Sequence, residues 1–276
     1  MRKKPQNKRL TAVIAIVTLI LAICKLLGVP SDESPNHDNS FDFSLDEYSW
    51  DEDLLERPFA VSDDLLTPPP LYSISLLKHY DEDYVTLNGN KPFFDTNDLL
   101  PNVFLHLSEL DELGRSGMAI ACVGQETVNK NERESAYGIN PSGWQSVKYD
   151  SVEGGYLYNR CHLIGYQLAG VSIKLRNLIT GTRYFNVSGM LQFENIVAYN
   201  IEKHKVHVIY RVTPVYSGNE LIARGVVIEA FSIEDSGKSV CFCVYVHNFQ
   251  PGIEIDYSTG DSRESDYDDD GLSAAA

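Results

Sequence analysis

Three consecutive runs of strand-forming residues constrain the fold more than any other feature of the sequence. They cover Val206 to Tyr216, Leu221 to Ile233 and Val240 to Phe249, and they are rich in Val, Ile, Tyr and Phe. The connections are short and contain turn residues, Ser217-Gly218-Asn219 in the first and Asp235-Ser236-Gly237 in the second. Short connections join antiparallel neighbours, because a parallel pair needs a long crossover. The sequence therefore predicts an antiparallel sheet.

Local patterns before these runs predict helices and further strands. An apolar stripe with helical spacing runs through residues 189–203 and consists of Met190, Phe193, Val197 and Ile201. Residues 84–94 resemble a hairpin around the turn Asn88-Gly89, and Gly114 predicts the end of a helix over 106–113. The predicted fold class is α+β with a central antiparallel sheet.

Charge divides the chain into segments. The formal net charge is −16, yet residues 29–66 carry −11, residues 253–276 carry −7, and residues 148–224 carry +4. This balance excludes a uniform basic coat but allows a locally basic site in the core. We predict an N-terminal signal or membrane anchor at 1–29, an acidic disordered linker at 30–70, a globular domain at 71–258 and an acidic disordered tail at 259–276.

The N-terminal segment has the pattern of an export signal. Met1 to Arg9 is basic, and Leu10 to Val29 is apolar apart from a few small polar residues and Lys25. A basic stretch followed by an apolar one marks export through a membrane or insertion into it. An uncleaved anchor on the extracellular face of the cell membrane is favoured over secretion after signal cleavage, because no clear cleavage site follows.

The segment Tyr156 to Asn200 carries the candidate chemistry. It contains His162 in the run Asn159-Arg160-Cys161-His162, followed by Asn177, Asn186 and Glu194. Each of these residues has an ordinary structural explanation when it is considered alone. The histidine suits a packed core position, the asparagines suit turns or helix caps, and the glutamate suits an exposed helix position.

Taken together, the residues resemble the DNA/RNA non-specific endonuclease family, which has the ββα-metal fold of the His-Me finger nucleases. The family pattern is Asp-Arg-Gly-His, then two Asn nine residues apart, then in some members a Glu eight residues further on, and this chain keeps both later spacings. The likeness is greatest to bacterial DNA-uptake nucleases and streptodornases. Further family-like phrases are Pro141-Ser-Gly-Trp144, Leu178-Ile-Thr-Gly-Thr-Arg-Tyr184, Tyr210-Arg-Val-Thr-Pro214 and Asn248-Phe-Gln-Pro-Gly252.

The resemblance implies Mg²⁺-dependent, sequence-non-specific hydrolysis of phosphodiester bonds in extracellular DNA, with RNA left open as a substrate and Mn²⁺ able to replace Mg²⁺. It implies that His162 is the general base for the attacking water and that Asn186 ligates the metal. Glu194 would accept hydrogen bonds from water around the ion. The partners implied are nucleic acid and, through the N-terminal segment, the membrane.

Supporting roles follow from the same resemblance. Asn177 would hold the loop that carries the site, and Arg160 would bind the substrate phosphate. Arg183 is a weaker candidate for a phosphate contact, argued only from its position three residues before Asn186.

Two positions depart from the family pattern. Asn159 replaces the family's Asp and supplies no charge, and Cys161 adds a side chain where the family has Gly. These departures motivate the alternative hypothesis, a catalytically inactive nucleic-acid-binding module on the same fold.

Overall fold

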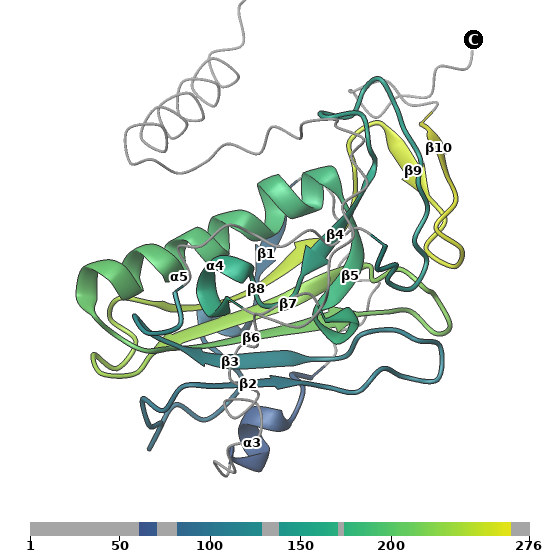
Figure 1. Cartoon of the computed structure of the whole chain (residues 1–276). Helices are drawn as coiled ribbons and strands as arrows, with labels where there is room; N and C mark the ends of the chain where they lie inside the picture. Colours follow the sequence, from purple (N-terminus) through teal and green to yellow (C-terminus); the bar gives the residue numbers. More distant parts are fainter. Residues whose placement is uncertain (1–60, 71–81, 129–137, 171–173, 266–276) are drawn as a thin grey trace, which may run out of the picture. The chain divides into compact units, whose positions relative to one another are not determined.

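The computed structural model describes residues 61–70, 82–128, 138–170 and 174–265. Within these ranges, six strands form one antiparallel sheet in the order β1-β8-β7-β6-β3-β2 (Figure 1). The strands are β1 (Tyr84–Thr86), β2 (Phe104–Leu107), β3 (Ala119–Val123), β6 (Val208–Val215), β7 (Gly225–Ser232) and β8 (Cys241–His247). The predicted α+β class with a central antiparallel sheet is confirmed.

Two smaller strand pairs and several short helices complete the described part of the chain. The pairs are β4 (Tyr158–His162) with β5 (Leu178–Thr182) and β9 (Ile253–Ile255) with β10 (Ser262–Glu264). The α-helices are α3 (Asp63–Leu66), α4 (Tyr166–Ala169) and α5 (Leu191–His204). Short 3₁₀ helices η2 (Asn88–Asn90) and η3 (Leu175–Asn177) and the π-helix η4 (Phe185–Met190) connect them.

The three predicted strand runs become β6, β7 and β8. They pair in sequence order, so that Tyr210 lies opposite Ala230 and Ala230 lies opposite Phe242. Every residue of β6 is buried, because one face of the strand lies under α5 and the other contacts a second apolar cluster. A central strand covered on both faces needs apolar residues at successive positions, which the sequence supplies.

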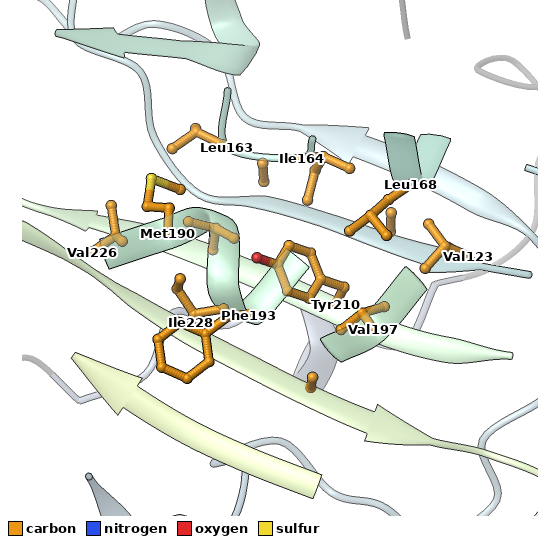
Figure 2. Packing of buried hydrophobic residues seen from close by; sticks show 14 of the residues in the cluster. Val123, Leu163, Ile164, Leu168, Met190, Phe193, Val197, Tyr210, Val226 and Ile228 are labelled. Carbon is orange, nitrogen blue, oxygen red and sulfur yellow. The ribbon is translucent and has the colours of Figure 1, made fainter. Parts of the chain in front are cut away.

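Helix α5 covers one face of the sheet (Figure 1). The predicted stripe is confirmed, since Phe193, Val197 and Ile201 are buried in the main apolar cluster beneath the helix (Figure 2). Gly189 lets the start of the helix approach β8 closely, because a Cβ there would lie 2.7 Å from Cγ1 of Val246. The helix ends at Lys205, whose left-handed backbone donates its N–H to the carbonyl of Ile201.

The opposite face of the sheet contacts α3. Leu65 of this helix is buried in a cluster with Ile120 and Ile209. Nη1 of Arg211 donates hydrogen bonds to the carbonyls of Leu65 at 3.1 Å and Thr67 at 2.7 Å. The predicted disordered linker extended to residue 70, but residues 61–70 are described in the structure and contain α3. Burial of Leu65 and the hydrogen bonds from the buried guanidinium of Arg211 hold this segment against the sheet.

The predicted hairpin at 84–94 is wrong. Tyr84 of β1 pairs with Val246 of β8, and Asn88 closes a 3₁₀ turn by donating to the carbonyls of Lys91 and Pro92. The second half of the expected hairpin does not pair as a strand, because Pro92 lacks an N–H and the N–H of Phe93 donates to Glu229.

The predicted helix over 106–113 is also wrong. Residues 104–107 form β2, which pairs antiparallel with β3, so that Phe104 lies opposite Cys122. Gly114 lies in a turn of the connection between β2 and β3 and does not end a helix. Its φ is +73°, and its N–H donates to the carbonyl of Asp111, whose carboxylate also accepts a side-chain hydrogen bond from Arg115. The non-local pairing with β3 outweighs the local helix signal.

The predicted disordered tail begins inside an ordered hairpin. Strand β10 pairs with β9, so that Arg263 lies opposite Glu254, and the two side chains form an ion pair. The predicted anchor at 1–29 and the tail beyond residue 265 lie outside the described residues. In the part of the chain that is described, no helix has the length and apolar character needed to cross a membrane.

Candidate active site

Strands β4 and β5 and the helix after them form a unit of two antiparallel strands followed by a helix. Arg160 lies opposite Thr180, and His162 lies opposite Leu178. After Thr182 the chain turns directly into η4 and α5, and the Oγ1 atom of Thr182 accepts a hydrogen bond from the N–H of Phe185 at 3.0 Å. All of the predicted site residues lie on this unit.

A buried asparagine from the central sheet holds β5 in place. Asn248 follows β8, and its Oδ1 accepts a hydrogen bond from the N–H of Thr182 at 3.0 Å. Its Nδ2 donates to the carbonyls of Thr180 at 3.1 Å and Ala223 at 2.9 Å. One side chain therefore satisfies backbone groups of β5 and of the segment before β7, which fixes the ββα unit against the sheet.

His162 is the last residue of β4 and is 5% exposed. The two-residue period of the strand places it on the same face as Tyr158 and Arg160, while Asn159 and Cys161 are on the other face. Backbone pairing with Leu178 therefore fixes the direction in which its side chain leaves the strand.

Asn177 fixes the segment that follows His162. Its side chain is fully buried and binds both backbone groups of Ile164, accepting from the N–H at 2.9 Å and donating to the carbonyl at 3.0 Å. Its own carbonyl accepts from the N–H of Leu163 at 2.9 Å. These contacts lock the chain immediately after the histidine, an arrangement that suits the loop-holding role implied by the family.

Glu194 lies in the first turn of α5 and meets the same segment. Its carboxylate packs against Gly165, where a Cβ would lie 2.4 Å from Oε2, and Nε2 of Gln167 donates to that oxygen at 3.4 Å. The glutamate and the segment after His162 are therefore in contact, although 32 residues separate Glu194 from His162 in the sequence.

Asn186 lies in the π-helix η4, which runs without a break into α5. The N–H of Leu191 donates to its carbonyl, which is the wider hydrogen-bond pattern of a π-helix. The side-chain amide of Asn186 is half-buried and forms no hydrogen bond with the described residues. Single π-turns inside α-helices are frequent at functional sites, because they redirect side chains from the regular helical positions.

The two candidate phosphate-binding arginines differ in their contacts. Arg160 donates to the carbonyl of Ile139 and, at 2.9 Å, to Oδ1 of Asn140, and its guanidinium stacks 3.9 Å from the ring of Trp144. Arg183 is anchored by its backbone N–H, while its guanidinium forms no hydrogen bond or ion pair with the described residues and its Nε is buried. The N–H groups of the Arg183 guanidinium can therefore still donate to a phosphate, which makes Arg183 a better candidate than its sequence position alone indicated.

The cysteine that departs from the family pattern is accommodated by a glycine on the neighbouring strand. Cys161 is fully buried, and its φ is not positive. A Cβ on Gly181 would lie 2.5 Å from its Sγ, so the thiol occupies the space that this glycine leaves open. The extra side chain therefore fits β4 without a left-handed backbone.

Comparison with known proteins shows the family of this chain. A model of the DNA/RNA non-specific endonuclease family matches residues 93–233, which include all the predicted site residues. The chain belongs to this family. It thus carries the domain of a family of nucleic-acid-cleaving hydrolases, and the predicted resemblance is confirmed.

Individual relatives of the endonuclease family agree with this assignment. A deoxyribonuclease of Streptococcus dysgalactiae subsp. equisimilis is 37% identical over 118 residues, which cover 41% of this chain and 34% of that protein. The chain thus spans about a third of the length of this curated relative. Sda1 nuclease, in a structure with a bound zinc ion, matches with a TM-score of 0.56 and 28% identity over 70% of this chain and 100% of that one.

A second solved structure shows the same fold. NucA from Streptococcus agalactiae, in a structure with magnesium ion bound, has a TM-score of 0.57 and 24% identity, covering 65% of this chain and 86% of that chain.

The sequence identified a family phrase at 248–252 but assigned no role to its residues. In this endonuclease domain, Asn248 holds β5, and Oε1 of Gln250 accepts a hydrogen bond from the N–H of Tyr184 at 3.0 Å. The sequence feature that could have indicated these roles is the pair of side-chain amides, Asn248 and Gln250, directly after a largely apolar strand.

Proposed function

We propose that this chain is a divalent-metal-dependent endonuclease that hydrolyses phosphodiester bonds of DNA without sequence preference, with His162 as its general base. The observation that carries the proposal is the contact network around the end of β4. Asn177 locks the backbone after His162, and Gly165 of the same segment supports the carboxylate of Glu194. A base and an acidic group held against the same short segment suit hydrolysis, in which a proton is removed while charge develops nearby.

The donor groups of this site suit a hydrated divalent ion. The Asn186 amide is half-buried and has no hydrogen-bond partner among the described residues, so its oxygen is available as a hard ligand. Mg²⁺ keeps several of its waters and needs few protein ligands. The described ranges contain no group of three or more His, Cys, Asp or Glu residues able to hold a metal. When bound, the ion would stabilise the negative charge that develops on the phosphate.

The relatives support a divalent ion without fixing its identity. The NucA structure contains magnesium and the Sda1 structure contains zinc. We propose Mg²⁺ as the working ion, with Mn²⁺ able to replace it, because an amide oxygen is a ligand that both hard cations accept.

The residues of this chain divide the remaining work. His162 takes the proton of the attacking water at a ring nitrogen, since neutral imidazole is abundant near pH 7. Glu194 orients water at the site by accepting hydrogen bonds. Arg183 binds the phosphate through its guanidinium, and Arg160, stacked on Trp144, presents a second positive charge.

The comparisons support the choice of substrate, and the N-terminal sequence supports the proposed location. The relative from Streptococcus dysgalactiae is named a deoxyribonuclease, which supports DNA as the substrate, and RNA is a second substrate to test. We propose that residues 1–29 direct the enzyme out of the cell and anchor it in the membrane, so that it acts on extracellular DNA. Secretion after cleavage of this segment is the alternative.

Digestion of linear and circular plasmid by the purified full-length chain tests the activity. We expect both forms to be cut with Mg²⁺ and neither to be cut with EDTA. His162→Ala should lower the rate by about 10²–10⁴-fold, the range that general bases contribute. The matched control is His204→Ala, because His204 is an exposed histidine at the end of α5. Activity of His162→Ala within tenfold of wild type would remove His162 as the base.

A titration with Mg²⁺ tests the metal ligand. Asn186→Ala should require more Mg²⁺ for half-maximal activity and should also lower the maximal rate. An unchanged titration would contradict the ligand assignment. A folded wild-type chain that binds DNA equally well in EDTA and cuts nothing would favour the inactive binding module instead.

A further inference from the structure

Tyr210 places a polar atom in the middle of the main apolar cluster. It is the third residue of β6, its side chain is fully buried, and its hydroxyl forms no hydrogen bond with any of the described residues. A buried hydroxyl without a partner destabilises a fold, and phenylalanine would fill the same space without this cost. The tyrosine therefore calls for an explanation other than packing.

The hydroxyl faces the part of the cluster that borders the candidate active site. Figure 2 shows the oxygen of Tyr210 turned toward the side where Met190 and Phe193 lie, with Ile164 of the same cluster above the tyrosine ring in this view. Met190 and Phe193 belong to the start of the helix, and Ile164 belongs to the segment that Asn177 locks. Both of these elements meet at Glu194.

Glu194 is a charged group that acts on this hydroxyl. It follows Phe193 in the helix, and its carboxylate rests on Gly165, the residue after Ile164. Burial raises the pKa of Tyr210 well above its usual value, and the negative charge of Glu194 raises it further. The tyrosine therefore keeps its proton and can only donate it in a hydrogen bond to an acceptor such as a carboxylate.

We propose that Tyr210 is a positioning residue whose buried hydroxyl donates a hydrogen bond, directly or through one water, to the Glu194 carboxylate in the active enzyme. The inference rests on the proposed function, since it explains how Glu194 is held while it orients water around the ion. A charge-assisted hydrogen bond of this kind in an apolar surrounding is stronger than one in water.

Tyr210→Phe removes only the hydroxyl and tests the proposal. We expect kcat/KM for plasmid cleavage to fall about tenfold and the Mg²⁺ concentration for half-maximal activity to rise several-fold. The thermal unfolding midpoint should change little, because loss of the hydrogen bond is offset by removal of a polar group from the core. The matched control is Thr213→Val on the same strand, which removes a second buried hydroxyl that has no partner among the described residues and lies on the opposite face. This control should leave activity unchanged.

A purely structural role predicts a different result. In that case Tyr210→Phe would change stability and leave the Mg²⁺ titration and the specific activity as they are, which would overturn the proposal. Binding of Mn²⁺, followed by its electron paramagnetic resonance signal in a His162→Ala background, gives a readout without turnover. We expect Tyr210→Phe to weaken this binding several-fold, and equal binding would also overturn the proposal.

A double-mutant cycle separates this inference from the proposed function. Unfolding midpoints in urea are measured for Tyr210→Phe, Glu194→Gln and the double variant. Non-additive midpoints support the hydrogen bond even if the wild-type chain cuts no DNA, and in that case only the proposed function fails. Additive midpoints in an enzyme that cleaves DNA would reject Tyr210 as the positioning residue and leave the function intact.

Discussion

Tyr210 and Arg211 are neighbours on β6, but they face opposite sides of the sheet and meet very different surroundings. Arg211 is buried and fully engaged, with Nε bonded to Oε2 of Glu229 at 2.6 Å and Nη1 bonded to carbonyls of the segment around α3. Tyr210 is equally buried, and its hydroxyl has no partner among the described residues. On the α3 face, the ion pair of Arg211 and Glu229 is satisfied and helps to order the chain, whereas on the α5 face the Tyr210 hydroxyl is a donor beside the candidate active site.

This contrast separates stability from function. Breaking a buried ion pair is expected to lower the free energy of unfolding, because the remaining charge is left in an apolar surrounding. A buried polar group without a partner that lies beside a candidate active site, as Tyr210 does, is a candidate for a role in that site. Variants on the α3 face should therefore change unfolding, and variants on the α5 face should change catalysis.

The largest stability effect is expected from Glu229→Gln. The carboxylate is fully buried and also accepts a hydrogen bond from the N–H of Phe93 at 2.8 Å. Loss of its charge leaves Arg211 uncompensated, which should lower the free energy of unfolding by about 3–5 kcal/mol. Urea unfolding measures this change, and the activity per folded molecule should stay the same.

Glu254→Gln is the matched control for this prediction. Glu254 pairs with Arg263, whose side chain is 71% exposed, so its loss should cost less than about 1 kcal/mol. If both variants lose the same stability, or if Glu229→Gln lowers the specific activity, the separation between the two faces is wrong.

Asn177→Ala should affect both stability and activity. It removes two hydrogen bonds to the buried backbone of Ile164, each expected to cost about 1–2 kcal/mol when its partner is left unsatisfied, so the expected loss is about 2–4 kcal/mol. Activity should also fall, because the chain after His162 loses its support. Asn200→Ala, which removes an exposed amide of α5, is the control and should change neither property.

The parts of the fold that were predicted correctly depend on local patterns. The strands β6 to β8 and the stripe of α5 follow from residue type and periodicity within single segments. Strands β1 and β2 were not predicted because each pairs with a strand outside its own segment, β1 with β8 and β2 with β3. This pairing outweighs the local turn signal at Asn88-Gly89 and the local helix signal at Gly114. The residue pattern of one short segment does not show which other strand it will pair with.

For the site, the spacing of the family pattern supplied the candidate residues, and their roles remain predictions. The environment around them could not be predicted from the sequence. That Glu194 rests on Gly165, or that Tyr210 ends in the apolar cluster beside them, depends on three elements meeting in space. No periodicity encodes whether a buried hydroxyl finds a partner.

Gly165→Ala tests the α5 face without removing any functional group. The φ of Gly165 is −60°, which alanine adopts readily, but its Cβ would lie 2.4 Å from Oε2 of Glu194. The carboxylate must therefore move, and we expect activity to fall about tenfold, equivalent to about 1.4 kcal/mol in the barrier. Stability should change by less than about 1 kcal/mol, since a glycine-to-alanine exchange at a permitted φ also restricts the unfolded chain. In a Glu194→Gln background the same substitution should have no further effect, and an additional loss would contradict the proposed cause.

The smallest effect on stability is expected from substitution of His207, which lies at the end of the sheet and not on either of the two faces compared above. His207, just before β6, lies between two carboxylates, with Nδ1 2.5 Å from Oε1 of Glu234 and Nε2 3.0 Å from Oε1 of Glu126. Burial alone would lower the pKa of His207, but its hydrogen bonds to Glu234 and Glu126 outweigh burial and raise it. Burial likewise raises the pKa of each carboxyl group, and hydrogen bonds, including those from His207, lower it overall.

The pH dependence of stability follows from these directions. A raised histidine pKa stabilises the fold fully below the unfolded value of about 6.5, and this contribution disappears as the pH rises through the folded value. Lowered carboxyl pKa values stabilise the fold above about pH 4.3, so the pairing is strongest between about pH 5 and 6.5. His207→Gln should therefore cost about 0.5–1 kcal/mol at pH 5.5, limited by solvent screening, and much less at pH 9. Urea unfolding at the two pH values measures the difference. An equal loss at both would mean that His207 acts by packing, and unchanged nuclease activity would show that ion pairs at the sheet end support the fold without contributing to the site.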